Sequence, residues 1–294
     1  MRTAETLGSL LREGIRALEA AGVENAAYDA GELLGHVTGR APADLRFQAE
    51  KSVAEADAAR YRALIARRTE HYPLQYLLRE WDFYNLSFSV REGVLIPRPE
   101  TELLVDLALQ HLKRYHAEGK PAQVLDLCSG SGCVGISVER NFENCAVTAL
   151  ELSDDACGII RSNMERNGTE RFTLLQGDLF RGRGAFGIEK ADVILANPPY
   201  LTGDEMKSLQ AEVDYEPSLA LFGGEDGLDF YRAIAEHYAP VLETGGLLAV
   251  EIGEQQGEEV ARIFADFSDN IKVLRDFSGL PRVVVSGLSF SLTI

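Results

Sequence analysis

The sequence predicts an α/β protein: a Rossmann-like, doubly wound parallel sheet with an antiparallel C-terminal hairpin, preceded by a small all-helical domain. From about residue 121 onward, short apolar runs alternate with helical stretches, which is typical of strands covered on both faces by helices. The first 70 residues instead carry apolar side chains at helical spacing. A chain of 294 residues has room for two domains of ordinary size.

Residues 1–75 are predicted to form the helical domain. Apolar residues recur at helical spacing from Leu7 to Leu18, and Gly22 follows as a stop signal. Residues 29–37 and 53–68 give two more amphipathic stretches. Such a domain either only packs against the rest of the chain or grips a partner, and its own residues leave both readings open.

A hairpin and an extended connector are predicted over residues 76–100. The aromatic, alternating residues 81–90 are typical of a β-hairpin, with Asn85 near its turn. Two prolines then flank Arg98, and prolines so placed exclude a helix interior or a central strand. The connector is therefore stiff and extended, and a helix is expected from about Thr101.

Residues 101–294 hold the predicted sheet. Its last two strands, residues 272–277 and 282–287, are joined by a short loop without a helix, so they should pair as an antiparallel hairpin at the sheet edge. The five predicted parallel strands are residues 124–127, 147–152, 172–176, 192–196 and 247–252.

The charge of the chain argues against nucleic acid as a stable partner. The sequence holds 29 Lys and Arg against 46 Asp and Glu, a net charge of −17, of which residues 1–75 carry only −1. Duplex nucleic acid is held mainly by neutralising its phosphates, so an acidic body suits it poorly. A local basic patch is still compatible with this net charge.

Membrane and metal sites are also not expected. No apolar run approaches the roughly 18 residues of a membrane span, and the N-terminus interleaves charges with leucines unlike a signal peptide. The four cysteines and five histidines show no metal-ligand spacing. We therefore expect a cytoplasmic protein without a metal site, and a monomer.

A glycine-rich loop follows the first predicted strand. Gly130-x-Gly132-x-x-Gly135 between a strand and a helix matches the dinucleotide fingerprint, and Glu151 ends the next strand, where an acid binds ribose hydroxyls. This pattern alone fits NAD and S-adenosylmethionine equally. Asp126 favours the second ligand, because a carboxylate at the mouth of the loop opposes a pyrophosphate and suits a cationic ligand without phosphates.

The third strand leads into a further candidate. Asp178 is placed to accept a hydrogen bond from an adenine amine, with Leu179 and Phe180 beside the ring, although a capping role for Asp178 is the alternative. The candidate cofactor-binding residues are Asp126, Cys128, Ser129, Gly130, Ser131, Gly132, Glu151, Asp178, Leu179 and Asn197.

The tetrapeptide Asn197-Pro198-Pro199-Tyr200 directly follows a predicted strand, so it should face a ligand bound at the carboxyl ends of the strands. The side-chain oxygen of Asn197 and the carbonyl of Pro198 offer two acceptors for a planar –NH2 group, and Tyr200 offers a ring to stack on it. Fixed acceptors stabilise positive charge that develops on the nitrogen. Asn197, Pro198 and Tyr200 are therefore the candidate catalytic residues.

With these motifs the chain resembles the PrmC/HemK family, the N5-glutamine methyltransferases of peptide-chain release factors. The resemblance covers nearly the whole chain. Its most specific part is the combination of the segments LIPRPETE at residues 95–102, NPPY at residues 197–200, and YEP through LFGGEDG at residues 215–227.

The resemblance implies a class I S-adenosylmethionine-dependent methyltransferase. It implies methylation of the side-chain amide nitrogen of the glutamine in the GGQ motif of class-I release factors, modulating translation termination, with S-adenosylhomocysteine as the other product. Cys128–Gly132, Glu151 and Asn197 correspond to cofactor positions. The substrate-binding candidates are Asn197, Pro198, Pro199 and Tyr200, together with Arg98 and Glu100 of the connector. The helical domain is then expected to recognise the protein substrate.

The chain departs from the family pattern at three cofactor positions. Cys128-Ser129 replaces a threonine-containing loop, Glu151 stands where Asp is more usual, and Leu179 stands where some relatives have tryptophan. Three rival functions stay open at this point: a nucleic-acid amino methyltransferase, an NAD-dependent oxidoreductase, and a release-factor binder without activity. The acidic body disfavours the first, and Asp126 disfavours the second.

Overall fold

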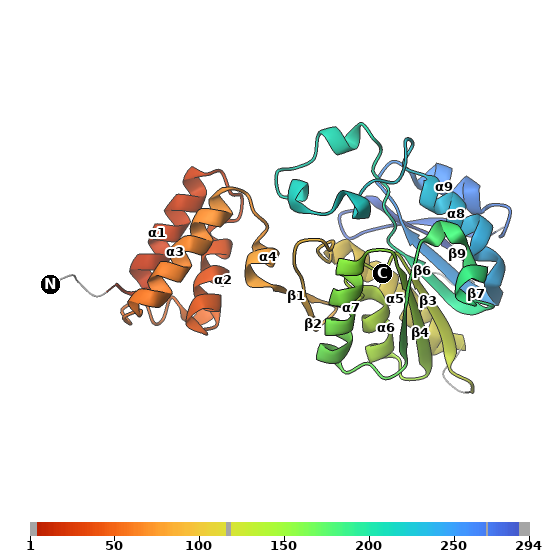
Figure 1. Cartoon of the computed structure of the whole chain (residues 1–294), viewed down its shortest axis with the longest axis horizontal. Coiled ribbons are helices and arrows are strands. Elements are labelled where there is room, and N and C mark those ends of the chain that lie inside the picture. The colour runs from red at the N-terminus through yellow and green to blue at the C-terminus, as the bar shows by residue number, and fades with distance from the viewer. Residues whose placement is uncertain (1–4, 116–118, 269, 288–294) are drawn as a thin grey trace. The chain divides into compact units, whose positions relative to one another are not determined.

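The computed structural model describes residues 5–115, 119–268 and 270–287 (Figure 1). Residues 1–4, where the N-terminal stretch interpreted above begins, lie outside the described residues. The chain divides into two compact units: the first is Met1–Glu80 with Gln210–Tyr215, and the second is Trp81–Leu209 with Glu216–Ile294. Within the described ranges, no helix is long and apolar enough to cross a bilayer.

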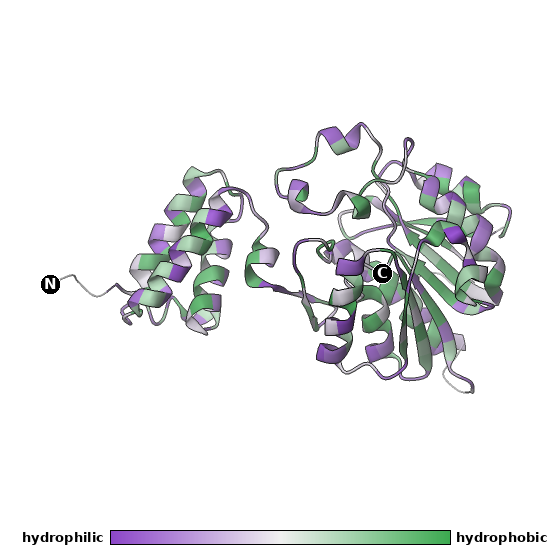
Figure 2. Cartoon of the chain, viewed as in Figure 1, coloured by the Kyte–Doolittle hydropathy of each residue, from purple (hydrophilic) through white to green (hydrophobic). Residues whose placement is uncertain are grey.

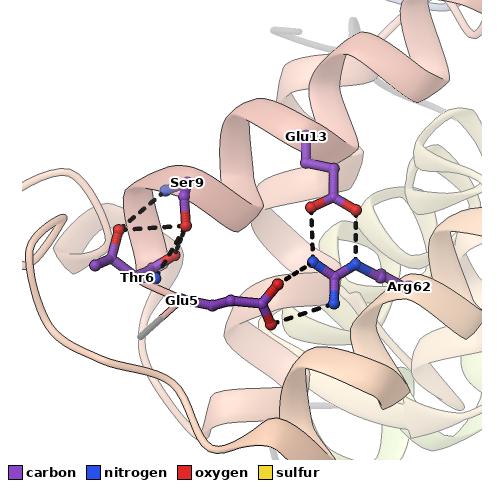
Figure 3. Close-up of polar contacts among 5 residues, drawn as sticks. All are labelled: Glu5, Thr6, Ser9, Glu13 and Arg62. Carbon is purple, nitrogen blue, oxygen red and sulfur yellow. Dashed lines mark hydrogen bonds and ion pairs between the residues drawn. The ribbon is translucent and has the colours of Figure 1, made fainter. Parts of the chain in front are cut away.

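The first unit is helical, as the sequence predicts. Thr6 and Ser9 form a reciprocal capping box at the start of the first helix, and Arg62 reaches the carboxylates of both Glu5 and Glu13 (Figure 3). Exposed ion pairs of this kind contribute little, so the unit is held mainly by its buried leucines and Tyr61. Its helices are α1 (Leu7–Ala20), α2 (Ala26–Thr38), α3 (Glu55–Thr69) and α4 (Leu74–Leu78).

The segment Gln210–Tyr215 belongs to this helical unit although it is remote in sequence. The buried guanidinium of Arg68 donates to Asp29 Oδ2 at 2.7 Å and to Glu212 Oε1 at 2.5 Å. The Tyr215 hydroxyl donates to the carbonyl of Glu70 at 3.1 Å. A segment of the chain beyond the NPPY motif is thereby fastened to the helical unit.

The predicted hairpin is confirmed. Its strands β1 (Glu80–Phe83) and β2 (Leu86–Ser89) form a two-stranded sheet. Tyr84 and Asn85 both have positive φ, 50° and 59°, the backbone of a two-residue hairpin turn. Asn163 joins this hairpin to the glycine loop, because its Oδ1 accepts from the Ser89 amide at 2.7 Å and its Nδ2 donates to the Ser131 carbonyl at 2.9 Å.

The second unit is built on a seven-stranded sheet in the order β5-β4-β3-β6-β7-β9-β8. The strands β3 to β7 are parallel, and β9 pairs antiparallel with both β7 and β8, which confirms the predicted edge hairpin. Strand order reverses between β3 and β6, the kind of position where open sheets bind ligands. The strands are β3 (Ala122–Leu127), β4 (Cys145–Glu151), β5 (Phe172–Gln176), β6 (Ala191–Ala196), β7 (Leu242–Glu251), β8 (Ile271–Arg275) and β9 (Pro281–Ser286).

Except at the start of β7, the bounds of the strands lie within two residues of the sequence prediction. Strand β7 begins at Leu242 rather than at residue 247, because Glu243, Thr244 and Gly245 are exposed and interrupt the apolar pattern. Strand β8 ends at Arg275 rather than at residue 277, because Asp276 begins a tight turn in which the Asp276 carbonyl accepts from the Gly279 amide at 2.9 Å. The apolar Phe277 in that turn is exposed.

Helices cover both faces of the sheet. Side chains of α5, α6 and α7 pack with one face, and those of α8 and α9 pack with the other. The strands are mostly hydrophobic, whereas the helices carry hydrophilic residues on their outer sides (Figure 2). The fold class is thus confirmed. The helices are α5 (Glu102–Tyr115), α6 (Cys133–Asn141), α7 (Asp154–Asn167), α8 (Asp229–His237) and α9 (Gly257–Phe264).

Candidate active site

A cavity of about 270 Å³ lies in the second unit, lined by segments that follow the carboxyl ends of β3, β4, β5 and β6. Gly132 is the one predicted cofactor residue outside the lining. It has a φ of 80° and is the N-cap residue that precedes α6. The predicted cofactor residues on the lining are Asp126, Cys128, Ser129, Gly130, Ser131, Glu151, Asp178, Leu179 and Asn197.

Asp126 lies at the base of the glycine loop and is 1% exposed. Its Oδ2 accepts from the Ser129 hydroxyl at 2.6 Å and from the Gly135 amide at 3.1 Å, so this carboxylate ties the start of the loop to the first turn of α6. Burial raises the pKa of Asp126 to about 6, against the opposing effect of these two hydrogen bonds. Asp126 therefore both caps the loop and adds acidic character to the cavity.

Glu151 ends β4, where the sequence predicts a ribose-binding acid. Its Oε2 accepts from the Gly130 amide at 2.8 Å, and its Oε1 accepts from the Ser153 amide at 2.8 Å. Burial is the main influence on this carboxyl and raises its pKa, whereas the two amides act in the opposite direction. A carboxylate oxygen can accept two hydrogen bonds, so each oxygen keeps capacity for a ligand hydroxyl.

Asp178 and Leu179 form the end of the cavity that follows β5. Asp178 Oδ1 accepts from the Phe180 amide at 2.9 Å and so caps a short 3₁₀ turn, which matches the alternative role given above. Asp178 nevertheless also lines the cavity, and capping occupies only one of its two oxygens. The apolar side chains of Leu179, Phe180 and Phe230 stand on the same lining.

The NPPY corner meets this cavity through Asn197 and Pro199, whereas Pro198 and Tyr200 are not on the lining. Pro198 is buried. The Tyr200 ring is partly buried and packs against the core on the α8 and α9 face, and the Tyr200 carbonyl accepts from Gln256 Nε2 at 2.9 Å. Burial raises the pKa of the Tyr200 hydroxyl to about 12, so this phenol stays protonated at neutral pH.

The LFGG segment packs directly on the NPPY corner. The Leu201 amide donates to the Leu221 carbonyl and the Gly223 amide donates to the Leu201 carbonyl, both at 2.8 Å. A Cβ at Gly223 would stand 2.7 Å from the Pro199 carbonyl oxygen and 2.7 Å from the Tyr200 Cα. The missing side chain of Gly223 therefore permits a close backbone approach that helps to fix the corner.

We expect Gly223→Ala to lower turnover by about tenfold or more, because a Cβ this close to two backbone atoms must shift the corner, and small displacements of positioning groups are costly. Initial-rate kinetics of the two proteins measure this change. Gly203→Ala is the matched control, since its nearest neighbours would be flexible side-chain atoms at 3.8 and 3.9 Å. Equal activity of the two variants would contradict a role for close packing at Gly223.

The connector carries the two remaining predicted residues. Arg98 lines the cavity and forms an ion pair with the buried carboxylate of Glu216, which also accepts from the Ile96 amide at 3.1 Å. Glu216, which belongs to the YEP segment, thus joins that segment to the connector. Glu100 is half-buried and does not line the cavity.

Two polar residues that are not among the predicted site residues support the NPPY corner. Thr101 lines the cavity and accepts from Asn197 Nδ2 at 3.1 Å, and its hydroxyl donates to Glu251 Oε2 at 2.6 Å. Glu251 ends the apolar strand β7 and is 2% exposed. A carboxylate at the carboxyl end of an apolar strand is a signal that the sequence did contain.

Comparison with known proteins bears on both units. The family profile of the PrmC N-terminal domain matches residues 9–78, and that of the methyltransferase small domain matches residues 101–213. The release factor glutamine methyltransferase of Thermodesulfovibrio yellowstonii is 40% identical over 233 residues, 79% of this chain and 82% of that protein. That of Moorella thermoacetica is 38% identical over 282 residues, 94% of this chain and 96% of that protein. The chain belongs to the release factor glutamine methyltransferase family.

Solved structures support the fold of this chain. A methyltransferase from Pyrococcus furiosus has a TM-score of 0.50 at 18% identity, covering 69% of this chain and 89% of that one. The hMettl16 catalytic domain, in complex with the MAT2A 3′UTR hairpin 6, has a TM-score of 0.53 at 13% identity, covering 82% of this chain and 84% of that one. These likenesses show a shared methyltransferase fold.

Membership of the release factor glutamine methyltransferases confirms the resemblance drawn from the sequence and removes the oxidoreductase alternative. In this methyltransferase, the acidic cavity and the NPPY corner adjoin, because Glu151 and Asn197 line the same space. A ligand in the cavity therefore lies beside the corner.

Proposed function

We propose that this protein transfers a methyl group from S-adenosylmethionine to the side-chain amide nitrogen of the glutamine in the GGQ motif of class-I release factors. The observation that supports this most is the orientation of Asn197. Its Nδ2 donates to Thr101 Oγ1 at 3.1 Å, which leaves Oδ1 as the atom that can accept a hydrogen bond at the cavity. The names of its relatives are consistent with this substrate.

The hydrogen-bond acceptors of the cavity fit S-adenosylmethionine. Glu151 has acceptor capacity for ribose hydroxyls, Asp178 for an adenine amine, and Asp126 adds negative character that suits a cation. Leu179 and Phe180 supply an apolar border for a base. The same acidic lining opposes a phosphate-bearing cofactor. When bound, S-adenosylmethionine supplies an electrophilic methyl group, and its transfer releases S-adenosylhomocysteine and one proton.

The NPPY corner would bind and orient the substrate amide. An amide nitrogen is a weak nucleophile because its lone pair is delocalised into the carbonyl. Asn197 Oδ1 and the Pro198 carbonyl would accept the two N–H groups and stabilise the positive charge that develops on nitrogen. Two prolines hold these acceptors rigidly, so orientation supplies part of the rate enhancement. The nitrogen becomes acidic once it is methylated, so a strong base is not needed before attack.

Mass spectrometry of a release factor tests this function directly. The intact factor is incubated with the enzyme and S-adenosylmethionine, and the peptide that holds GGQ is fragmented. We expect one added methyl group on the glutamine side chain, and none when the glutamine is replaced. A DNA or RNA substrate is tested in parallel with labelled cofactor, and label in nucleic acid alone would overturn the proposal.

The helical unit carries a basic pocket suited to an acidic segment of the release factor. Three arginines and a histidine gather around two tyrosines, although the unit as a whole carries a net charge of −3. The Arg67 guanidinium lies 4.2 Å from the centroid of the Tyr72 ring. Complementary charge of this kind steers association and fixes register. The charged and aromatic residues of the pocket are His36, Arg60, Arg67, Tyr72, Tyr76 and Arg79.

We expect Arg60→Glu to raise KM for an intact release factor several-fold without changing kcat, because it reverses a charge at this pocket and changes no residue that lines the cavity. A short peptide that holds only GGQ should show no change. Arg16→Glu, an equal change of charge on α1 outside the pocket, is the control. An identical KM for the two variants would contradict recognition through the pocket.

A further inference from the structure

A chain of hydrogen bonds leads from the cavity to a buried carboxylate. Asn197 Nδ2 lies 3.1 Å from Thr101 Oγ1, which in turn lies 2.6 Å from Glu251 Oε2. Thr101 and Glu251 are each 2% exposed. Within the structure described here, Thr101 is thus the link between the reacting corner and the end of β7.

The charge state of Glu251 fixes the direction of this chain. An ionised carboxylate can only accept, so the single hydroxyl proton of Thr101 is donated to Glu251. The Thr101 oxygen is then left with lone pairs alone, and it must accept from the –NH2 end of Asn197. The carbonyl end of Asn197 is consequently the end available to a substrate.

We propose that Glu251 is a positioning residue for methyl transfer, acting through Thr101 to hold Asn197 in the amide orientation that presents Oδ1 to the substrate nitrogen. The proposal rests on the proposed function only for the identity of the group that Oδ1 receives. A protonated Glu251 can donate to Thr101, which frees the Thr101 proton for Asn197 Oδ1. The Asn197 amide then rotates, and its –NH2 end faces the substrate –NH2. Two hydrogen-bond donors then face each other, so the contact is unfavourable.

The surroundings of Glu251 allow this switch near neutral pH. Burial, the largest influence, raises the pKa of Glu251 to about 7, while the Thr101 hydrogen bond and the cations Arg282 and Arg98 favour the ionised form. Glu100 opposes ionisation. The other titratable groups that interact with Glu251 are Tyr200, Tyr231 and Cys133. The correct Asn197 orientation is therefore lost as pH falls through about 7.

Nuclear magnetic resonance of the Asn197 side chain tests the orientation without relying on activity. Protein labelled with ¹⁵N in asparagine is titrated, and the Asn197 –NH2 signals are assigned by their absence from Asn197→Ala. We expect these signals to shift with a midpoint near pH 7 and to stay fixed in Glu251→Gln, whose amide can donate to Thr101 at every pH. Signals that do not titrate, or that titrate equally in Glu251→Gln, would overturn the proposal.

Kinetics then test the consequence for methyl transfer. Glu251→Gln and Thr101→Val should each lower kcat by about tenfold or more, and Glu251→Gln should also lose the acidic limb of the pH profile. Thr101→Ser keeps the hydroxyl and should retain most of the activity. Unchanged S-adenosylhomocysteine affinity shows that each variant is folded. Full activity of Glu251→Gln and Thr101→Val would overturn the proposal.

The two proposals fail in different ways. A wild-type Asn197 side chain that titrates as expected, in an enzyme that leaves GGQ glutamine unmodified, would contradict the proposed function and leave the role of Glu251 standing. Methylation of GGQ by wild type and Glu251→Gln at equal rates across the pH range would contradict the role of Glu251 and leave the proposed function standing.

Discussion

Replacing Asn197 with alanine is expected to lower kcat by roughly 10²–10³, the usual effect of losing one preorganised polar group at a site of developing charge. In the proposed mechanism the Asn197 side chain is the acceptor that Thr101 orients toward the cavity, through the 3.1 Å contact of its Nδ2. The reacting nitrogen loses one of its two acceptors in the variant. The contacts of Glu151 and Asp126 with the glycine loop are untouched, so S-adenosylhomocysteine should bind with nearly unchanged Kd.

Single-turnover kinetics with saturating cofactor measure the rate of methyl transfer, and calorimetric titration measures the Kd of S-adenosylhomocysteine. Asn141→Ala is the matched control, because Asn141 ends α6 and its Nδ2 only donates to the Ser137 carbonyl at 2.8 Å. A large loss of cofactor affinity in Asn197→Ala with little loss of kcat would show that Asn197 belongs to the cofactor site instead.

Replacing Glu151 with alanine is expected to weaken cofactor binding most. In the proposed site the variant removes the acceptors for two ligand hydroxyls, and hydrogen bonds to a charged group contribute about 1.5–3 kcal/mol each. It also leaves the Gly130 and Ser153 amides without the partner that each has at 2.8 Å. The Kd of S-adenosylmethionine should rise by roughly 10²-fold, while kcat at saturating cofactor falls much less.

Isothermal titration of S-adenosylmethionine and S-adenosylhomocysteine measures this change. Glu165→Ala is the control, since Glu165 is an exposed carboxylate on α7 that does not line the cavity. Glu151→Ala with wild-type affinity would remove the ribose-binding role. If Asn197→Ala mainly weakened cofactor binding and Glu151→Ala mainly lowered kcat, the roles assigned to the two residues would be wrong.

The sheet is the part of the fold that sequence patterns predict well. Short apolar runs separated by helices are local signals, and the strand at residues 172–176 has the bounds that the sequence predicts. The start of β7 and the end of β8 were not predicted correctly. Exposed residues at the start of β7 and the turn after Arg275 interrupt the apolar pattern. Glu212 shows a further limit, since its ion pair with Arg68 joins residues that are far apart in sequence.

The candidate site divides in the same way. The glycine loop, Glu151 and Asn197 could be found because each follows a strand at the same end of the sheet. Thr101 and Glu251 could not be paired from sequence, because they meet only after the helix α5 and the strand β7 are packed together. The assignment of Asp126 was incomplete for a similar reason, since its hydrogen bond with Gly135 depends on the geometry of the loop.

The most direct test of the account is a crystal structure with S-adenosylhomocysteine and a peptide that contains GGQ. We expect the glutamine Nε2 to lie within about 3.2 Å of both Asn197 Oδ1 and the Pro198 carbonyl oxygen, with its remaining face toward the sulfur. A glutamine bound elsewhere, or an Asn197 that presents Nδ2 to the peptide, would contradict it.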